Sequence, residues 1–317
     1  MTNRETDVFI ISFNRLGYLK TLIDWLEKSG FENIHIVDNN STYPPLLEYL
    51  SSSKHQVHRM KKNFGHLAVW DSKKFEDIVD KKYYIVSDCD VAPINECPQN
   101  ITEYFFGILK KYPKVTKAGF GMKIDDLPEV YAYKESVAQW EKKFWEKKIG
   151  EGLYDAPIDT TFALYRPGIF PPDKKWWRSI RTDFPYLARH LPWYQDSSHP
   201  DEEEIYYEKS LKNRSSFWGV VDLGLLKKYN ADLREELNAV YVSYAWRFLQ
   251  AIYKIANVFV RGDRFQRKIG KKNMPSLEGT KDPRIVQRQN IEILAELGAI
   301  YASAGWRFLK KSGKTKT

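Results

Sequence analysis

The run SDCD at positions 87–90 places two carboxylates, Asp88 and Asp90, two residues apart and directly after the apolar segment YYIV at 83–86. Where a chain leaves a strand and turns out of the pleat, side chains at i and i+2 can both reach one divalent cation. Hard oxygen ligands of this kind suit Mg²⁺ or Mn²⁺, whose other positions are commonly filled by water and substrate phosphate. Such a pair is also frequent in ordinary acidic turns, so these residues alone leave both alternatives open.

The elements that must position this pair alternate along the first 125 residues. Short β-rich apolar runs alternate with segments whose apolar residues recur at helical spacing, which indicates βαβ units. Strands are expected at 7–12, 34–37, 56–59, 83–86 and 117–121, and helices at 16–28, 44–50, 67–79 and 101–111. This order predicts a Rossmann-like α/β domain with a mostly parallel central sheet flanked by helices. Ligands bind such sheets outside the carboxyl ends of the strands.

The later part of the chain has a different pattern. We expect a helix over 133–148, a strand over 157–166, a long irregular stretch over 167–200 and a helix over 202–212. Two long helices, 231–260 and 283–311, follow, and AVYVSYAWRFL at 239–249 is echoed by AIYASAGWRFL at 299–309. We therefore predict one domain over 1–225, with halves at about 1–125 and 126–225, and a helical extension over 226–317.

Composition excludes several classes of protein. The chain has 317 residues, of which 43% are hydrophobic, and only two are cysteines, so neither a disulfide scaffold nor a cysteine-based zinc site is expected. Mean hydropathy is −0.55, and no apolar run reaches the ~20 residues of a membrane-spanning helix. The opening MTNRETDVFI leaves no room for a secretory signal. These features predict a soluble, cytoplasmic protein.

The excess of basic residues that gives the net charge of +9 lies in the C-terminal segment of the chain. Residues 261–317 carry 14 Lys and Arg against 5 Asp and Glu, which leaves 36 of each sign before them. A nucleic-acid-binding domain usually spreads its basic residues over one face, so no nucleic-acid partner is expected. Basic residues beside the aromatic-rich segment 239–260 favour contact with an anionic membrane surface, although a helical pair packed on the rest of the protein explains the same residues.

Four motifs together resemble the GT-A glycosyltransferases, in particular those like family 2. In order they are SFNR at 12–15, VDNNS at 37–41, NFG at 63–65 and SDCD at 87–90. The resemblance covers residues 6 to 92, and its ordered spacing is far more specific than any single motif. It implies a nucleotide-sugar site that uses a divalent cation, Mn²⁺ or Mg²⁺.

The resemblance also implies roles for individual residues. Asp38 takes the base or ribose, and Asp88 with Asp90 holds the diphosphate through the metal. Asn14 and Arg15 flank the nucleotide, with Asn63 at the later N-x-G. ARHLPW at 188–193 is similar to the late histidine segment of some members, although it lacks the Gly and Lys. This implies His190 as a metal ligand, with His199 as the alternative.

An inverting member of this family also needs a carboxylate that accepts the acceptor hydroxyl's proton. Asp159, at the start of the expected strand, is the first candidate, and Glu203, in the acidic helix start, is the second. A retaining enzyme needs no such base. Arginines at 178, 181 and 189 could close over the pyrophosphate, with Arg189 the nearest to the late histidine.

The resemblance predicts a hexosyltransferase that moves a sugar, most simply from a UDP-sugar, to a saccharide or glycolipid in surface-polysaccharide assembly, on the inner face of the membrane. The alternative is a non-catalytic nucleotide- or glycan-binding protein on the same fold. A nucleotidyltransferase would show a Gly-rich basic motif after the first strand, and SFNRLG at 12–17 lacks one.

Overall fold

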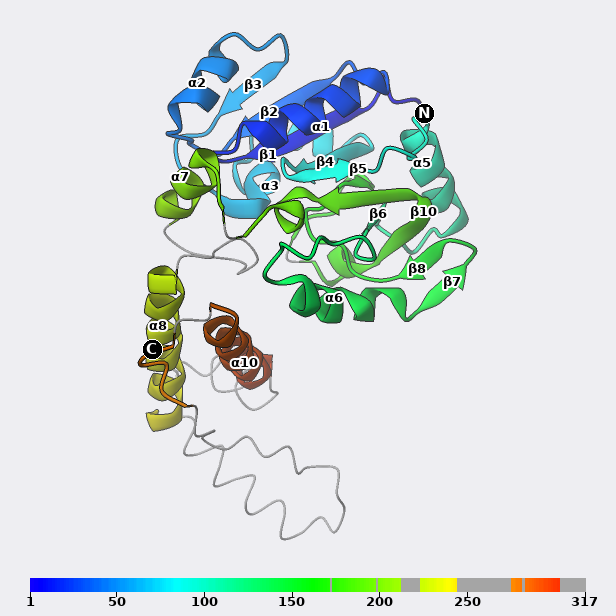
Figure 1. Cartoon of the computed structure of the whole chain (residues 1–317). Coiled ribbons are helices and arrows are strands. Elements are labelled where there is room, and N and C mark those ends of the chain that lie inside the picture. The colour runs from blue at the N-terminus through cyan, green and yellow to red at the C-terminus, as the bar shows by residue number, and fades with distance from the viewer. Residues whose placement is uncertain (172, 198, 212–222, 244–274, 281–282, 303–317) are drawn as a thin grey trace, which may run out of the picture. The chain divides into compact units, whose positions relative to one another are not determined.

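The computed structural model describes residues 1–171, 173–197, 199–211, 223–243, 275–280 and 283–302 (Figure 1). The chain divides into two compact units, Met1–Gly219 and Val220–Thr317. The first unit holds a ten-stranded mixed sheet with helices, and the described part of the second holds two long helices.

Four neighbouring strands in the order β3-β2-β1-β4 form the parallel part of the sheet. They span Asp7–Ser12 (β1), Ile34–Asp38 (β2), Gln56–Arg59 (β3) and Tyr84–Asp88 (β4). Their registers pair Ser12 with Asp38 and Ile11 with Asp88, so all three strands end at one edge. The predicted α/β class with a parallel central sheet flanked by helices is confirmed.

Beyond β4 the sheet is mixed, because β9 runs antiparallel to both β4 and β6 while β10 runs parallel to β6. The further strands are β5 (Val91–Pro93), β6 (Lys117–Met122), β7 (Lys148–Gly150), β8 (Leu153–Asp155), β9 (Ala163–Tyr165) and β10 (Ser179–His190). Gly119 of β6 lies close against β9: a Cβ there would come within 2.3 Å of the carbonyl oxygen of Phe162. Only glycine allows the two strands to approach this closely.

Both faces of β1, β2 and β4 are covered, which is why these strands are nearly continuous apolar runs. Val8 and Ile10 of β1 belong to a core shared with α1, α2, α5 and α6, whereas Phe9 and Ile11 face a second core with α3 and α4. The helices span Gly17–Lys28 (α1), Pro44–Ser51 (α2), Ala68–Asp71 (α3), Glu76–Val79 (α4), Ile101–Lys111 (α5), Lys134–Lys142 (α6) and Glu202–Ser210 (α7). Short 3-10 turns are η1 (Gly65–Leu67), η2 (Lys143–Trp145), η3 (Lys174–Trp177) and η4 (Leu191–Tyr194).

Helix α1 follows its sequence pattern closely. Its apolar face is buried as the spacing predicted, through Leu19, Leu22, Ile23 and Leu26. The helix ends before Gly30, whose φ of 79° lies in the left-handed region. The N–H groups of Gly30 and Phe31 donate to the carbonyls of Glu27 and Leu26, which satisfies the last turn.

Two local predictions were wrong. The helix expected over 67–79 is broken into η1, α3 and α4, with Lys73 at a φ of 56° between the two α-helices. The stretch 167–200 was expected to be irregular but contains β10, which has 12 residues and pairs with β5, β6 and β8. Its strand conformation depends on these distant partners, which no local periodicity records.

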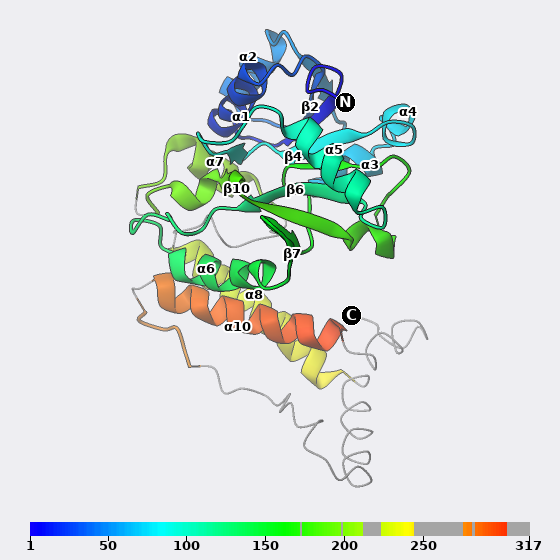
Figure 2. The same ribbon diagram turned by 90° about the vertical axis from the view of Figure 1, so that its right-hand side faces the viewer.

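The described part of the second unit contains two helices of 20 residues each, α8 (Leu223–Val242) and α10 (Pro283–Ala302), which lie side by side (Figure 2). Five buried residues of α8 have buried counterparts in α10 at an offset of 60: Leu226, Asn230, Leu233, Leu237 and Val240 in α8, and Val286, Asn290, Ile293, Leu297 and Ile300 in α10. Gln289 of α10 is also buried, outside this pattern. The alternating spacing of four and three is that of a coiled-coil seam. The helices confirm part of the predicted pair, α8 begins earlier than expected, and residues 244–260 and 303–311 lie outside the described residues.

The two buried asparagines fix the register of this seam. Nδ2 of Asn230 donates to Oδ1 of Asn290 at 2.7 Å, and Nδ2 of Asn290 donates to the carbonyl of Leu226. Leu226 and Val286 cluster at the start of both helices, so the pair runs parallel. A buried polar pair at an a-type position stabilises one register at some cost in free energy.

We expect Asn290→Leu to weaken the α8–α10 pair, because the buried amide of Asn230 then faces a leucine and loses its acceptor. An unsatisfied buried amide costs about 1–3 kcal/mol, so hydrogen exchange of α8 amides should become roughly tenfold faster or more. The control is Asn238→Leu, at an exposed position of α8, which should leave exchange unchanged. Equal exchange in all three proteins would contradict the role of the Asn pair.

A buried histidine chain joins the parallel strands and predicts a pH dependence. Nε2 of His58 lies 3.0 Å from Nδ1 of His35, whose Nε2 lies 3.0 Å from Oδ1 of Asp7. Burial, with the charges of His35 and Lys74, lowers the pKa of His58 to about 4. The unfolded chain therefore binds this proton more tightly than the folded chain does.

We expect this contribution to the free energy of unfolding to be complete above pH 6.5 and to be lost between pH 6.5 and 4, by on the order of 2 kcal/mol. Urea denaturation at pH 7 and 4.5 measures it. His58→Asn should reduce the difference between the two pH values, whereas His199→Asn, at an exposed site, should not. An unchanged difference in His58→Asn would refute the assignment.

Candidate active site

The carboxyl ends of three neighbouring strands bring the predicted acidic residues to one edge. Asp38 ends β2 and Asp88 ends β4, with β1 between them. The chain stays bonded as it leaves the sheet: the N–H of Asn39 donates to the carbonyl of Ser12, and that of Cys89 to the carbonyl of Ile11. The edge is therefore a fixed frame for the side chains that project from it.

Asp38 is fully buried and is held by the turn that follows it. Its Oδ1 accepts the N–H of Ser41 at 3.1 Å. Its Oδ2 has no hydrogen-bond partner and lies 3.7 Å from Nε of Arg59 at the end of β3. One oxygen of Asp38 therefore holds the turn that follows β2, and the other lacks a hydrogen-bond donor.

Asn14 connects the loops around this edge through hydrogen bonds. It is buried with a φ of 51°. Its Oδ1 accepts the N–H groups of Thr42 and Tyr43, and its Nδ2 donates to Oγ of Ser210 at the end of α7. The amide group of Asn14 is thus occupied within the chain, and its contacts join β1, the loop after β2 and α7.

Asn63, the third motif residue, stands on an exposed turn. Its Oδ1 accepts the N–H of Gly65 at 2.7 Å. Asn39 ties the turn to the carboxyl edge, because its amide donates to the carbonyl of Gly65 and accepts the N–H of Phe64, both at 2.8 Å. Sequence reasoning did not single out Asn39, although it lies inside the DNNS motif.

The structure brings Asp88, Asp90 and His190 together. Burial, and then the charges of Asp90 and Asp159, raise the pKa of Asp88 well above its usual range, against the hydrogen bond from Thr160. Oδ1 of Asp90 is buried without a hydrogen-bond partner, 3.6 Å from Nε2 of His190. Burial lowers the pKa of His190, against the charge of Asp90.

This group of residues fits a divalent cation in its chemistry. The charge of Asp90 adds to the burial that raises the pKa of Asp88, and a cation between the two carboxylates would relieve that repulsion. Oδ1 of Asp90 and the imidazole ring of His190 are of suitable types to act as metal ligands. Among the described residues, however, no three His, Cys, Asp or Glu side chains form a ready-made metal cage.

Arg15 lies beneath this group and is paired inside the protein. Its side chain is 4% exposed, its Nη1 lies 2.8 Å from Oε2 of Glu204, and its guanidinium is 3.7 Å from the ring centre of Tyr207. Burial alone would lower the pKa of Arg15, but the charges of Glu204, Tyr207 and Asp90 raise it by more than burial lowers it. The net pKa of Arg15 is raised, so the guanidinium stays charged. Glu204 is a partner that sequence reasoning missed, because 189 residues separate the two.

The other predicted residues have defined partners too. The carboxylate of Glu203 accepts the N–H groups of Leu16 and Gly17 at the start of α1, which is a capping role. Arg189 pairs with Asp126 at 2.5 Å. Arg181 is buried against Glu141 at 2.8 Å, so it is not a mobile lid.

Asp159 is placed next to the acidic pair. Its side chain is 57% exposed, and its Oδ1 lies 3.8 Å from Nε2 of His66. The next residue, Thr160, holds Asp88 twice: its hydroxyl donates to Oδ2 at 2.8 Å, and its carbonyl accepts the N–H of Asp88 at 3.1 Å. These bonds hold the backbone next to Asp159 beside Asp88, and the carboxylate of Asp159 remains exposed. Nothing in the sequence pointed to Thr160 or His66.

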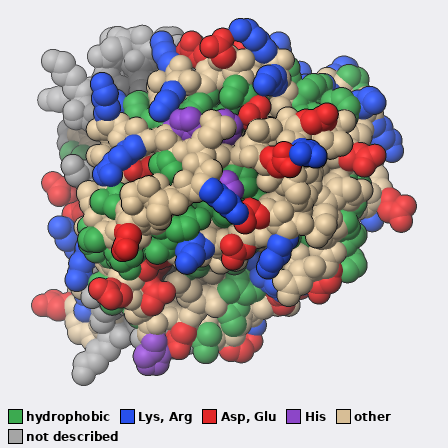
Figure 3. Space-filling model, turned by 90° about the horizontal axis from the view of Figure 1, so that it is seen from above, with side chains coloured by type: hydrophobic (Ala, Val, Ile, Leu, Met, Phe, Trp, Pro, Cys, Tyr) green, Lys and Arg blue, Asp and Glu red, His purple; other side chains and the backbone are tan. Residues whose placement is uncertain are grey.

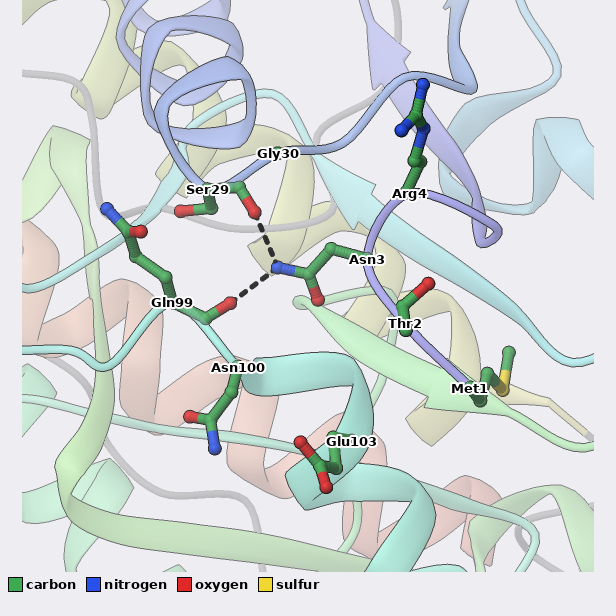
Figure 4. Close-up of a pocket in the computed structure, with 9 residues that line it drawn as sticks. All are labelled: Met1, Thr2, Asn3, Arg4, Ser29, Gly30, Gln99, Asn100 and Glu103. Carbon is green, nitrogen blue, oxygen red and sulfur yellow. Dashed lines mark hydrogen bonds between the residues drawn. The ribbon is translucent and has the colours of Figure 1, made fainter.

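A hollow at the start of the chain lies away from these residues. It is lined by Met1–Arg4, Ser29, Gly30, Gln99, Asn100 and Glu103, and Figure 4 shows Nδ2 of Asn3 bonded to the carbonyls of Ser29 and Gln99. These residues precede β1, follow α1 and lead into α5. None of them belongs to the carboxyl edge, so we do not assign the hollow to the site.

Charge on the surface agrees with the even balance of residues 1–260. The face seen in Figure 3 carries Lys and Arg side chains interspersed with Asp and Glu, without one continuous basic patch. No described helix is long and apolar enough to cross a membrane.

Comparisons with known proteins were made at three levels. No family model and no curated sequence matches the chain. Among solved structures, it is similar to the mannosyltransferase PcManGT from Pyrobaculum calidifontis in complex with GDP-Man and Mn²⁺, with a TM-score of 0.40 and 11% identity over 91% of this chain and 86% of that one. It is also similar to S. aureus TarS, with a TM-score of 0.39 and 13% identity over 93% of this chain and 55% of TarS.

We expect Arg15→Ala to destabilise the first unit strongly, because it leaves Glu204 as an unpaired buried charge. Breaking one side of such a pair costs about 3–5 kcal/mol, measured by urea denaturation. Arg15→Met combined with Glu204→Leu should recover most of this loss. The control is Arg4→Ala, which breaks the exposed pair with Glu32 and should cost less than about 1 kcal/mol. Similar losses in both single variants would contradict a buried pair.

Proposed function

We propose that this chain is a metal-dependent glycosyltransferase that moves a sugar from a nucleoside-diphosphate sugar to a hydroxyl group. One observation carries the proposal: Asp38 and the Asp88–Asp90 pair share the carboxyl edge of the parallel strands β2, β1 and β4, and Oδ1 of Asp90 has no hydrogen-bond partner. Crevices at this edge are where α/β sheets bind nucleotides.

Each part of the donor has a candidate partner. Asp38, with an unpaired oxygen, is suited to accept a hydrogen bond from the base or ribose, and the Asn39–Asn63 turn flanks it. Asp88, Asp90 and His190 would hold a divalent cation, Mn²⁺ or Mg²⁺, which when bound neutralises charge on the leaving diphosphate. Arg15 keeps a fixed positive charge beneath these ligands, which favours an anionic group above them.

Asp159 is the proposed base. Its exposed carboxylate can accept the proton of the acceptor hydroxyl as the new glycosidic bond forms and the bond to the diphosphate breaks, which corresponds to inversion. Glu203 is a weaker candidate, since its oxygens already accept two backbone N–H groups. We propose a UDP-sugar donor and a saccharide or glycolipid acceptor. The predicted membrane contact concerns residues 239–272, most of which lie outside the described residues.

The expected result for Asp90→Ala is loss of transfer by at least about 100-fold, with the melting temperature of the free protein nearly unchanged. The control is Asp125→Ala, an exposed acidic residue paired with Lys123, which should keep full activity. A thermal-shift panel supplies the binding data: nucleoside diphosphates and nucleotide-sugars, each with Mn²⁺, Mg²⁺ or chelator.

Stabilisation by one diphosphate family, only with metal and absent in Asp90→Ala, would support the transferase and identify the base. Full activity of Asp90→Ala with Mn²⁺ would refute the metal assignment. Metal-dependent nucleotide binding by wild type without any turnover, including hydrolysis of the donor, would favour the non-catalytic binding protein instead.

A further inference from the structure

A large aromatic side chain is exposed next to the segment that carries Asp159. Trp177 ends the turn η3 and is 54% exposed, whereas its neighbour Trp176 is buried in the core with Trp70 and Tyr165. A single exposed apolar side chain is ordinary by itself. The residues around Trp177 are what indicate a ligand-binding role for it.

The turn that presents Trp177 is held firmly. The hydroxyl of Thr116 donates to the carbonyls of Lys175 and Arg178, and the N–H of Thr116 donates to the carbonyl of Arg178 at 2.8 Å. Asp173 caps the turn by accepting the N–H of Lys175. An indole on a fixed turn loses little conformational entropy when a ligand stacks on it.

One buried ammonium group joins this indole to the candidate base. Nζ of Lys117 donates to the carbonyl of Asp159 at 3.1 Å and lies 5.7 Å from the ring centre of Trp177. Lys117 itself is fully buried against Trp176, with Nζ 3.7 Å from the ring centre. Lys117 thus lies between the exposed indole of Trp177 and the backbone of Asp159.

Charge is concentrated at the same turn. Its exposed residues include three cations, Lys174, Lys175 and Arg178, against one carboxylate, Asp173. An aromatic face flanked by cations suits a ligand with a flat apolar side and negative charge. A sugar ring with a carboxylate or phosphate substituent has both features.

We propose that Trp177 is the stacking platform for a sugar ring of an acidic saccharide acceptor, whose hydroxyl is thereby directed towards Asp159. This inference rests on the proposed transferase function and names the acceptor class for it. Lys117 acts as a positioning residue, because it links the platform to the backbone of Asp159.

The test compares Trp177→Ala with Trp140→Ala. Trp140 is 53% exposed and, like Trp177, lies near a lysine, with Nζ of Lys143 3.1 Å from its ring centre, so it is a matched control on α6. Binding is measured first by calorimetry, with a galacturonic acid hexamer as the acidic probe and maltohexaose as the neutral one. Acceptor KM and kcat follow with whichever sugar supports transfer.

We expect Trp177→Ala to weaken binding of the acidic probe and to raise the acceptor KM by about tenfold, with kcat for donor hydrolysis and metal-dependent nucleotide binding unchanged. Trp177→Phe should retain most of the affinity, and Trp140→Ala should match wild type. Equal effects of Trp177→Ala and Trp140→Ala, or no binding of either probe to wild type, would overturn the platform. Tighter binding of the neutral probe would overturn the acidic acceptor.

Failure of the transferase proposal has a different signature. Wild-type protein that binds the acidic probe through Trp177 but neither binds nor hydrolyses any nucleotide-sugar retains the saccharide site and refutes the transfer reaction. Protein that hydrolyses a nucleotide-sugar with metal, but binds neither probe, retains the donor site and refutes the platform.

Discussion

The constraint on which this site depends is the repulsion between two carboxylates, Asp88 and Asp90, at a partly buried strand end. Burial already raises the pKa of Asp88, and the neighbouring charge of Asp90 raises it further. Thr160 compensates in part, because its hydroxyl donates a hydrogen bond to the side chain of Asp88. The backbone N–H of Asp88 also donates to the carbonyl of Thr160. No hydrogen bond to Oδ1 of Asp90 offsets the remaining negative potential. In the proposed transferase, a cation bound at this strand end would relieve the repulsion.

Arg15 explains how the chain tolerates this potential before a ligand arrives. The guanidinium is buried, so its desolvation needs a counter-charge, and Glu204 on α7 supplies it at 2.8 Å. Tyr207 covers the other side of the group at 3.7 Å. Helix α7 is therefore tied to the carboxyl edge by charge, and the cap that Glu203 places on α1 strengthens the same attachment.

The sequence predicted the features that depend on neighbouring residues in the chain. The apolar runs of β1, β2 and β4 are continuous because both faces of the parallel sheet are covered, and the acidic residues follow these runs directly. Glu204, Thr160 and the strand β10 were not predictable, since each depends on a partner far away in sequence. His190 was reached only through the family resemblance, and its place beside Asp90 follows from the pairing of β10 with β5.

The second unit shows the opposite case, a long-range feature that the sequence does record. The aromatic echo drew attention to 239–249 and 299–309, most of which lies outside the described residues. The same offset of 60 continues towards the N-terminal side, where it relates five buried residues of α8, from Leu226 to Val240, to five buried residues of α10. Single helices of 20 residues are marginal in water, so most of their stability must come from this shared seam. Both helices have the same spacing of buried residues, with an asparagine at the same position. When the helices run parallel in this register, buried residues meet buried residues and the two asparagines meet each other, so the sequence repeat accounts for the parallel pairing.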